Sequence, residues 1–181
     1  SIRDSILAVS GGLDTSPAGP HPFPNVDSWQ FTIHYPFHAV YDSNLRSVYL
    51  MVQRARRHPF LALFDAADPN ISTATRQVTI TPTQSLYLMN APLVHQHADQ
   101  LASRISARYE PTDTDTDQAA VAAYENVLAR HPSEFEIAQS TNFLKRSREI
   151  LRSTDDEGAW HQSIAAFCRV LLTSNEFLYV D

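Results

Sequence analysis

Apolar side chains recur every three to four positions along the C-terminal half of the chain, which is the spacing of one helix face. One such stripe is formed by Val94, Ala98, Leu101 and Ile105. Three further stripes follow, one ending near residue 131, one over residues 134–151 and one over residues 160–172. The pattern therefore predicts four amphipathic helices after residue 90.

Residues typical of helix ends lie where these and other apolar stretches begin or stop. In the first ten residues Ile2, Ile6 and Val9 have helical spacing, and the glycine pair at 11–12 predicts a stop. Proline is favoured at the first position of a helix, so three helix starts are predicted, at Pro59, Pro82 and Pro92. Ser133 followed by Glu136 fits a capping box, in which both side chains satisfy amide donors of the first turn.

A period of two replaces the helical spacing over residues 29–37, where aromatic and aliphatic side chains alternate with polar ones. Val48, Leu50 and Val52 alternate in the same way after turn residues at 42–44. Together the two runs predict one β-hairpin. The four prolines between residues 13 and 27 predict a long surface loop before it.

These elements predict a mainly α protein. We expect a single helical-bundle domain over residues 1–181, with five or six helices, one β-hairpin and the Pro-rich N-terminal loop. The stretch 46–94 has the longest apolar runs, so we expect it to form the core. Its side chains expected to be buried are Leu50, Phe64, Leu86 and Met89.

Composition narrows the class of protein. The formal net charge of −6 disfavours a nucleic-acid partner, whose phosphates attract positive charge. The mean hydropathy is −0.28 and no apolar run approaches the roughly 20 residues of a membrane span. A single cysteine, Cys168, excludes an internal disulfide and a cysteine-ligated metal cluster, and no C-x-x-C-H motif attaches haem. We therefore expect no cofactor in this chain.

Histidine and acidic clusters do not have the spacing of metal ligands. His34 and His38 are about 13 Å apart on an extended strand, and His95 and His97 face different ways on a helix, so surface or capping roles are expected. The acidic loop at 65–70 offers Asp65, Asp68 and Asn70 as oxygen donors, but a calcium loop requires more oxygens and a glycine at its turn. Turn and capping roles are the simpler interpretation.

The best candidate for ligand binding is a dense positive cluster of Arg54, Arg56, Arg57 and His58. Guanidinium groups bind carboxylates and sulfates in a bidentate manner, so the cluster is a candidate anion site. The alternative is a structural network with nearby aspartates or helix carbonyls. Trp29 and Tyr35 of the aromatic strand are candidate sugar-stacking residues, although such alternation is more often core-facing.

No motif identifies catalytic residues. A G-x-S-x-G nucleophile elbow is absent from the sequence. Cys168 lies on the apolar stripe of its predicted helix, where a buried and inert thiol is expected.

Blocks of sequence nevertheless resemble a known family. The blocks are RSVYLMVQR at 46–54, HPFLALFDAADPN at 58–70, TRQVTITPTQSLYLMNAPLV at 75–94, LTSNEFLYVD at 172–181 and IRDSILAVSGGLD at 2–14. They are similar to the planctomycete-type C-terminal domain of unknown function. That resemblance implies a large exported protein that often also carries a cytochrome c-like haem domain and is often associated with polysaccharide breakdown.

Two functions follow as expectations. The first is a non-catalytic interaction or scaffolding module that docks on upstream domains of the same polypeptide. The second is part of an enzyme that binds or processes anionic polysaccharide. An extracytoplasmic location, periplasmic or secreted, is implied by the resemblance only. The opening Ser1-Ile2-Arg3-Asp4 has no leader of basic then apolar residues, so we expect this chain to be the C-terminal piece of a longer protein.

Overall fold

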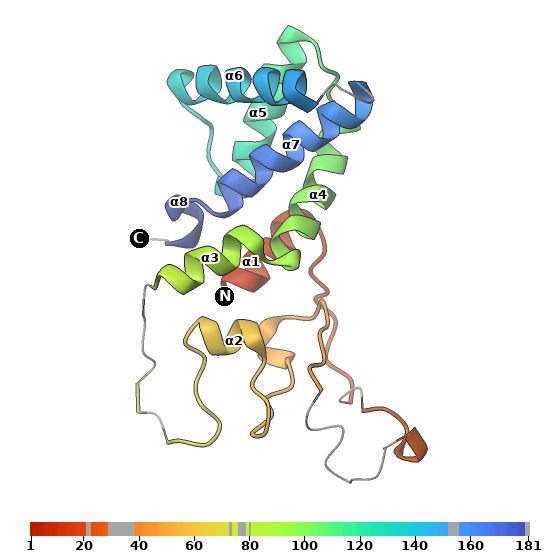
Figure 1. The fold of residues 1–181 in the computed structure, drawn as a ribbon, viewed down its shortest axis with the longest axis vertical. Helices are drawn as coiled ribbons and strands as arrows, with labels where there is room; N and C mark the ends of the chain where they lie inside the picture. The colour runs from red at the N-terminus through yellow and green to blue at the C-terminus, as the bar shows by residue number, and fades with distance from the viewer. Residues whose placement is uncertain are drawn as a thin grey trace. The chain divides into compact units, whose positions relative to one another are not determined.

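The fold is helical in the part of the chain that the computed structural model describes (Figure 1). That part comprises residues 1–20, 23–28, 39–72, 74–75, 79, 81–151 and 156–179. It contains eight α-helices, six of which have seven or more residues, and no β-strand. The prediction of a mainly α protein is therefore confirmed.

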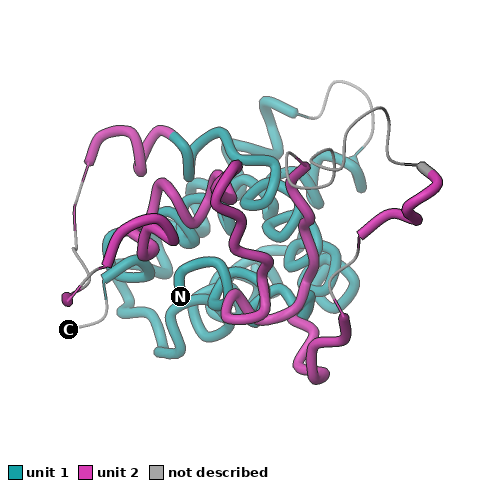
Figure 2. Tube along the Cα trace, turned by 90° about the horizontal axis from the view of Figure 1, so that it is seen from below, with its two compact units in different colours: residues 1–12, 87–181 teal, residues 13–86 magenta. Residues whose placement is uncertain are grey.

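The chain separates into two compact units, which Figure 2 distinguishes by colour. Unit 1 comprises residues 1–12 and 87–181, and unit 2 comprises residues 13–86. Helix α3 (Pro82–Asn90) begins in unit 2 and ends in unit 1. The expectation of a single domain stays a prediction.

Unit 1 is built on α4 (Pro92–Ser106) and α7 (Asp156–Leu172), which pack against each other along their lengths (Figure 1). They run antiparallel, because His95 near the start of α4 contacts Arg169 and Ser103 near its end contacts His161. Helices α5 (Asp113–Leu128) and α6 (Glu134–Leu151) pack on α7 and on each other. Helix α1 (Ile2–Ser10) packs on α4, and the short α8 (Asn175–Leu178) follows α7.

The core of unit 1 consists of aliphatic side chains separated by small ones. Among its fully buried side chains are Ile6, Leu7, Val94, Leu101, Leu144, Ile164, Cys168 and Leu172. Helix α5 contributes Ala119, Ala120 and Ala123, each at most 1% exposed. Alanine at these positions lets the backbone of α5 approach its neighbours closely. The stripe predicted from sequence for this helix, Val121, Tyr124 and Leu128, is only half-buried, so the packed face differs from the predicted one.

Helix α1 ends as its glycines predict. Gly11 has a φ of 78°, the left-handed conformation that closes a helix, and its N–H donates to Ala8. Gly12 is needed for space, because a Cβ there would lie 2.9 Å from Cε1 of His97. The Nδ1 atom of His97 is 2.8 Å from Oγ of Ser10, so this ring joins α4 to the end of α1.

The turn between α5 and α6 is held by a network around Arg130. Ser133 and Glu136 form the predicted capping box, with the Glu136 carboxylate accepting from the Ser133 amide at 2.8 Å and Ser133 Oγ accepting from the Glu136 amide. Arg130 donates two hydrogen bonds to Glu136 and two to Glu176 of α8. Its guanidinium also lies over the Tyr124 ring, 5.3 Å from the centroid.

Unit 2 contains short elements, namely the 3-10 turns η1 (Val26–Ser28) and η3 (Ser47–Tyr49) and helix α2 (Pro59–Leu63). The predicted second strand at 48–52 is wrong. Backbone hydrogen bonds there are local, from Tyr49 to Arg46 and from Leu50 to Ser47, so the amides serve a tight turn and not a ladder. The first predicted strand, residues 29–37, lies outside the described residues.

The prediction that 46–94 forms the core holds only in part. Leu50 is 5% exposed as predicted and Phe64 is half-buried, but Leu86 and Met89 are 61% and 66% exposed. Helix α3 instead buries Gln84 and Leu88, which lie four residues apart. Gln84 can be buried although it is polar, because its amide group is hydrogen-bonded: Nε2 donates to Leu63 O and Oε1 accepts from the Thr81 amide.

Candidate functional site

The predicted anion site lies on an irregular segment of unit 2, residues 54–58, immediately before α2. We call it the cationic segment. Arg57 is used inside the unit: its Nη2 donates to Ala66 O at 3.0 Å and its Nη1 lies 3.6 Å from Oδ2 of Asp68. For Arg57 the structure therefore favours the structural network that sequence analysis left open.

His58 is also engaged with its own unit. Its Nε2 lies 2.7 Å from Oδ1 of Asp42, and its side chain is 8% exposed whereas that of Asp42 is 78% exposed. A carboxylate accepts hydrogen bonds, so Nε2 carries the proton. The Nδ1 atom is buried without a hydrogen-bond partner, as is Oε1 of Gln53.

The remaining two cations, Arg54 and Arg56, are exposed at the surface. The Arg54 backbone carbonyl accepts from Nδ2 of Asn70 at 3.4 Å, which ties the cationic segment to the loop after α2. The structure thus divides the four predicted residues. Two hold the segment in place, and two present their charge outward.

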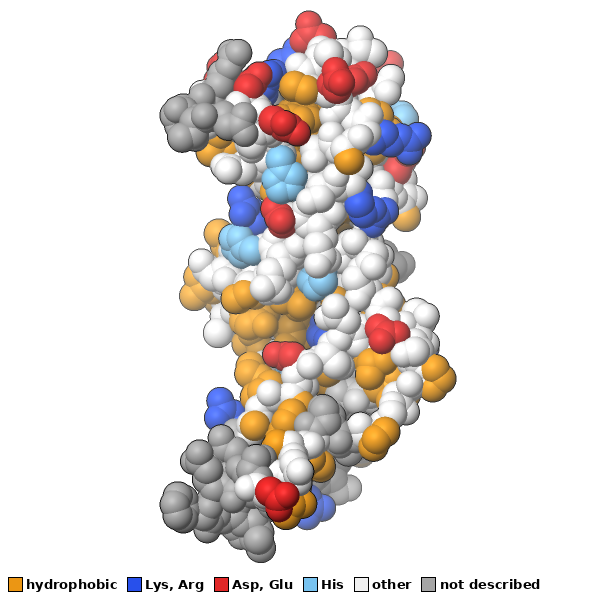
Figure 3. All heavy atoms as spheres, turned by 90° about the vertical axis from the view of Figure 1, so that its right-hand side faces the viewer, with side chains coloured by type: hydrophobic (Ala, Val, Ile, Leu, Met, Phe, Trp, Pro, Cys, Tyr) orange, Lys and Arg blue, Asp and Glu red, His pale blue; other side chains and the backbone are white. Residues whose placement is uncertain are grey.

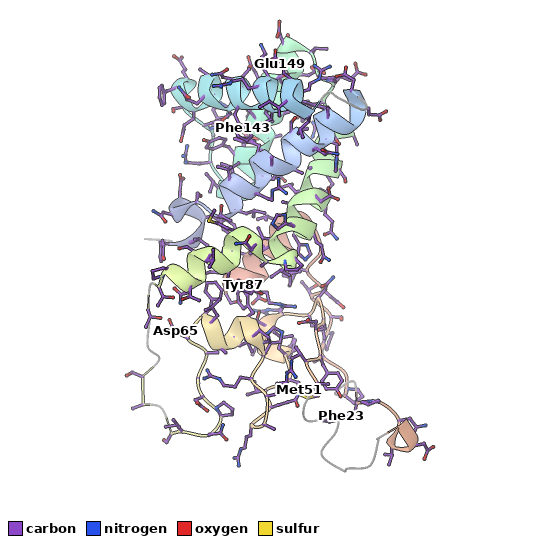
Figure 4. All side chains as sticks on the ribbon, viewed as in Figure 1. Phe23, Met51, Asp65, Tyr87, Phe143 and Glu149 are labelled. Carbon is purple, nitrogen blue, oxygen red and sulfur yellow. The ribbon has the colours of Figure 1, made fainter. Side chains whose placement is uncertain are left out.

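Of the acidic residues in the loop after α2, Asp68 has the predicted turn role, whereas Asp65 binds a residue distant in the chain. Asp68 Oδ1 accepts from the Asn70 amide at 2.9 Å. Asp65, labelled in Figure 4, has a φ of 55°, and its carboxylate accepts from the amide and hydroxyl of Thr79 at 2.7 to 2.9 Å. No group of three or more His, Cys, Asp or Glu among the described residues is placed to hold a metal ion.

Sequence reasoning missed the partners that organise this region. Asp42, Gln53 and Thr79 contact residues that are 14 to 16 positions away in the chain. No spacing in the sequence indicates such pairs. The Thr81–Gln84 contacts, in contrast, are three residues apart and follow the local rule for the start of a helix.

In unit 1 a serine, a histidine and an aspartate meet on the surface where α4 packs on α7. Nε2 of His161 is 3.1 Å from Oγ of Ser103 and 3.6 Å from Oδ1 of Asp99. A hydrolytic triad requires the base to contact nucleophile and acid through different ring nitrogens. Here both partners face Nε2, so these residues do not have triad geometry.

His97 departs from the expected surface or capping role, because it is 4% exposed. Burial lowers its pKa, opposed by the hydrogen bond with Gln100, which lies 2.9 Å from Nδ1. His95 is exposed on another side of α4, so the prediction that the two rings face different ways is confirmed. Cys168 is fully buried, and burial raises the pKa of its thiol to about 12, as expected for an inert cysteine.

Among the depressions formed by described residues of unit 1 are the following two. One of about 200 Å³ is lined by Pro111, Asp113, Thr116, Lys145, Arg148, Glu149 and Trp160. The other is an open groove between α5 and α6 of about 560 Å³, lined by Asp117, Glu134, Ile137, Ala138, Thr141, Asn142 and Lys145. Neither contains residues of the cationic segment. The candidate sugar-stacking residues, Trp29 and Tyr35, lie outside the described residues.

On the face shown in Figure 3, acidic and basic side chains are interspersed and neither sign forms a continuous field. Among the helices that the structure describes, none is both long and apolar enough to cross a membrane.

Fold and candidate site together define a helical domain that carries a cationic surface segment. A family model matches residues 1–144, so the chain belongs to the PSD1 family, described as "Protein of unknown function (DUF1553)". The resemblance to a domain of unknown function is thereby confirmed, although the block at 172–181 lies beyond the matched residues. No curated protein and no solved structure matches the chain.

Proposed function

We propose that this chain is an interaction module that docks on upstream domains of an exported, cytochrome-associated polypeptide. The observation that supports the proposal best is the surface of residues 47–56, which we call the docking segment. Val48 and Val52 are 75% and 60% exposed, Tyr49 is 41% exposed, and Arg54 and Arg56, which follow in the chain, are exposed as well. Interfaces are enriched in tyrosine and arginine, and exposed apolar side chains gathered in one place are typical of binding surfaces.

Contacts within unit 2 hold the docking segment in a defined conformation. Leu50 and Gln53 point inward at 5% and 6% exposure, and Nε2 of Gln53 donates to Ala39 O at 2.7 Å. Arg57 and His58 fix its C-terminal end. A segment held in this way loses little conformational entropy on binding, which favours affinity.

The test is calorimetric titration of the chain with separately produced upstream domains of the same polypeptide. We expect saturable binding that weakens about tenfold or more in Val48→Ser with Val52→Ser, because each substitution removes buried apolar area at the interface. Val170→Ser, which changes a 53% exposed valine of α7, is the matched control and should bind normally. Unchanged affinity in the double variant would remove the docking segment from the proposal.

The second candidate function is binding of anionic polysaccharide, alone or as part of a glycan-processing enzyme. It is favoured by the outward position of Arg54 and Arg56, whose guanidinium groups suit sulfate and carboxylate. Binding of sulfated or uronic-acid oligosaccharides should then be lost on Arg56→Ala and weakened by salt, but be insensitive to Val48→Ser. Saturable glycan binding without affinity for upstream domains would replace the docking proposal with this one.

A further inference from the structure

The ring of His97 lies in a closely packed contact between α1 and α4, which we call the His97 junction (Figure 1). Its members Arg3, Ser10 and His97 are 3% to 4% exposed. A Cβ at Gly12 would lie 2.9 Å from Cε1 and 3.2 Å from Nδ1 of the ring, so the backbone just after α1 closes over it. The ring therefore reaches water only if the end of α1 moves away from α4.

The hydrogen bonds of the junction fix which nitrogen of the neutral ring carries the proton. Nδ1 lies 2.9 Å from Oε1 of Gln100, an amide oxygen that only accepts. Nδ1 also lies 2.8 Å from Oγ of Ser10, which donates its own proton to Leu7 O at 3.0 Å. The neutral ring thus carries its proton on Nδ1, and a second proton would be added at Nε2.

A second proton would create a positive charge that the junction does not stabilise. Burial lowers the pKa of His97 because it removes the water that solvates the charged ring, and Arg3 of α1 lowers it further by repulsion. The hydrogen bond to Gln100 opposes this shift in pKa but does not cancel it. The packed junction therefore favours the neutral ring.

The charged groups around the junction come from both helices. Helix α1 contributes Arg3 and Asp4, whose Nη1 and Oδ1 atoms lie 3.8 Å apart. Helix α4 contributes Arg104, whose Nη1 donates to a backbone carbonyl near the end of α1 at 3.1 Å. The titratable side chains of α7 that bond to α4, Arg169 and His161, do so at residues other than His97.

From this geometry we propose that the His97 junction is an acid-sensitive contact, in which a second proton on the ring favours release of α1 from α4. When α1 leaves the ring, His97 regains water and binds a proton more readily, so falling pH shifts the equilibrium towards the open state. Gly12 is followed by the first residue of unit 2. Opening therefore also frees the point at which the chain enters that unit.

The direction of the pKa shift sets the pH range of the response. The released ring has the ordinary pKa of 6.5, and the packed ring has a lower one. Stabilisation by the junction is therefore complete above pH 6.5 and is lost as the pH falls below that value, until the packed ring itself is protonated. At pH 5 most carboxylates are still ionised, so a comparison of pH 7 with pH 5 reports chiefly on histidine.

Amide hydrogen exchange at pH 7 and pH 5, corrected for the intrinsic exchange rate, tests the proposal. Protection of the Ile6 and Leu7 amides should fall by about threefold or more at pH 5, relative to amides in the middle of α5. His97→Gln, which cannot take up a proton, should abolish this fall. His131→Gln removes a histidine whose side chain is 66% exposed and should leave the fall unchanged.

Equal protection of α1 at both pH values in the unmodified chain would overturn the proposal, as would an undiminished fall in His97→Gln. A second measurement does not depend on the folding of that variant. In an NMR titration of the unmodified chain, the His97 ring should change its chemical shift with a midpoint below 6.5. A midpoint at or above 6.5 would also overturn the proposal.

Discussion

Leu144 and Leu86 are the same side chain in two helices, but Leu144 is 0% exposed in α6 whereas Leu86 is 61% exposed in α3. The difference lies in what each helix turns inward. Helix α6 directs Leu144 and Ser140 inward, while α3 directs Gln84 and Leu88 inward. An apolar residue in a helix is therefore predicted to be buried only if it is known which face of that helix packs against the rest of the protein.

Truncating these two leucines should separate the two cases. Leu144→Ala leaves a cavity in a fully packed site and should cost about 2–5 kcal/mol of the free energy of unfolding. Leu86→Ala removes an exposed side chain and should change it by less than about 0.5 kcal/mol. Urea denaturation at neutral pH measures both, and equal losses in the two variants would show that this assignment of burial is wrong.

At the scale of elements, the ends of helices carry much of the specific bonding in unit 1. Arg130 follows Ala129, which ends α5 with a φ of 53°, and it donates to carboxylates of α6 and α8. The hydrogen bonds from Arg130, with those from Ser133, lower the pKa of Glu136 to about 2. The pKa of Glu176 is lowered as well, chiefly by Arg130, while that of Arg130 is raised.

These shifts predict an acid-sensitive contribution to stability. Because the pKa of Glu136 is lower in the folded protein than its ordinary value of 4.5, its contribution is complete above that value and is lost as the pH falls towards 2. Replacing Arg130 with Met should destabilise the protein at pH 7, and the difference from the unmodified protein should shrink between pH 4.5 and 2.

Denaturation midpoints at several pH values measure this difference. Arg146→Met serves as the control, since it removes an exposed arginine of α6 and its effect should not vary in that pH range. A difference for Arg130→Met that stays constant down to pH 2 would contradict the role given to the network.

Across the whole molecule, the deepest burial is unevenly distributed. Among the residues that the structure describes, the largest fully buried side chains all belong to unit 1, in α1, α4, α6 and α7. The described part of unit 2 buries Leu50, Phe60, Gln53 and Gln84 and contains α2, a helix of five residues, and the beginning of α3. Local stability follows buried apolar contact, so the two units should differ in how readily their backbones open.

Amide hydrogen exchange measures that difference. Amides in the middle of α4 and α7 should exchange more slowly than those of α2 by more than about tenfold, which corresponds to about 1.4 kcal/mol. Amides of α5, which packs through alanines, should be protected to a similar degree as those of α4. Equal protection in α2 and α7 would indicate that both units open together.

The sequence alone determined the features that depend on neighbouring residues, namely the positions of helices and the residues at their ends. Stripes of helical period identified α4 to α7, Gly11 ended α1, and Ser133 with Glu136 began α6, because each depends on residues within four positions of one another. The family also followed from sequence blocks.

The tertiary structure decided what depends on residues distant in the chain. It placed Gln84 inward in α3, paired His58 with Asp42 and joined Arg130 to Glu176 across 46 positions. It also divided the cationic segment into two residues that hold unit 2 together and two that face outward. These outcomes depend on which backbone and side-chain groups come into contact when the chain folds. The periodicity of the sequence does not predict such long-range contacts.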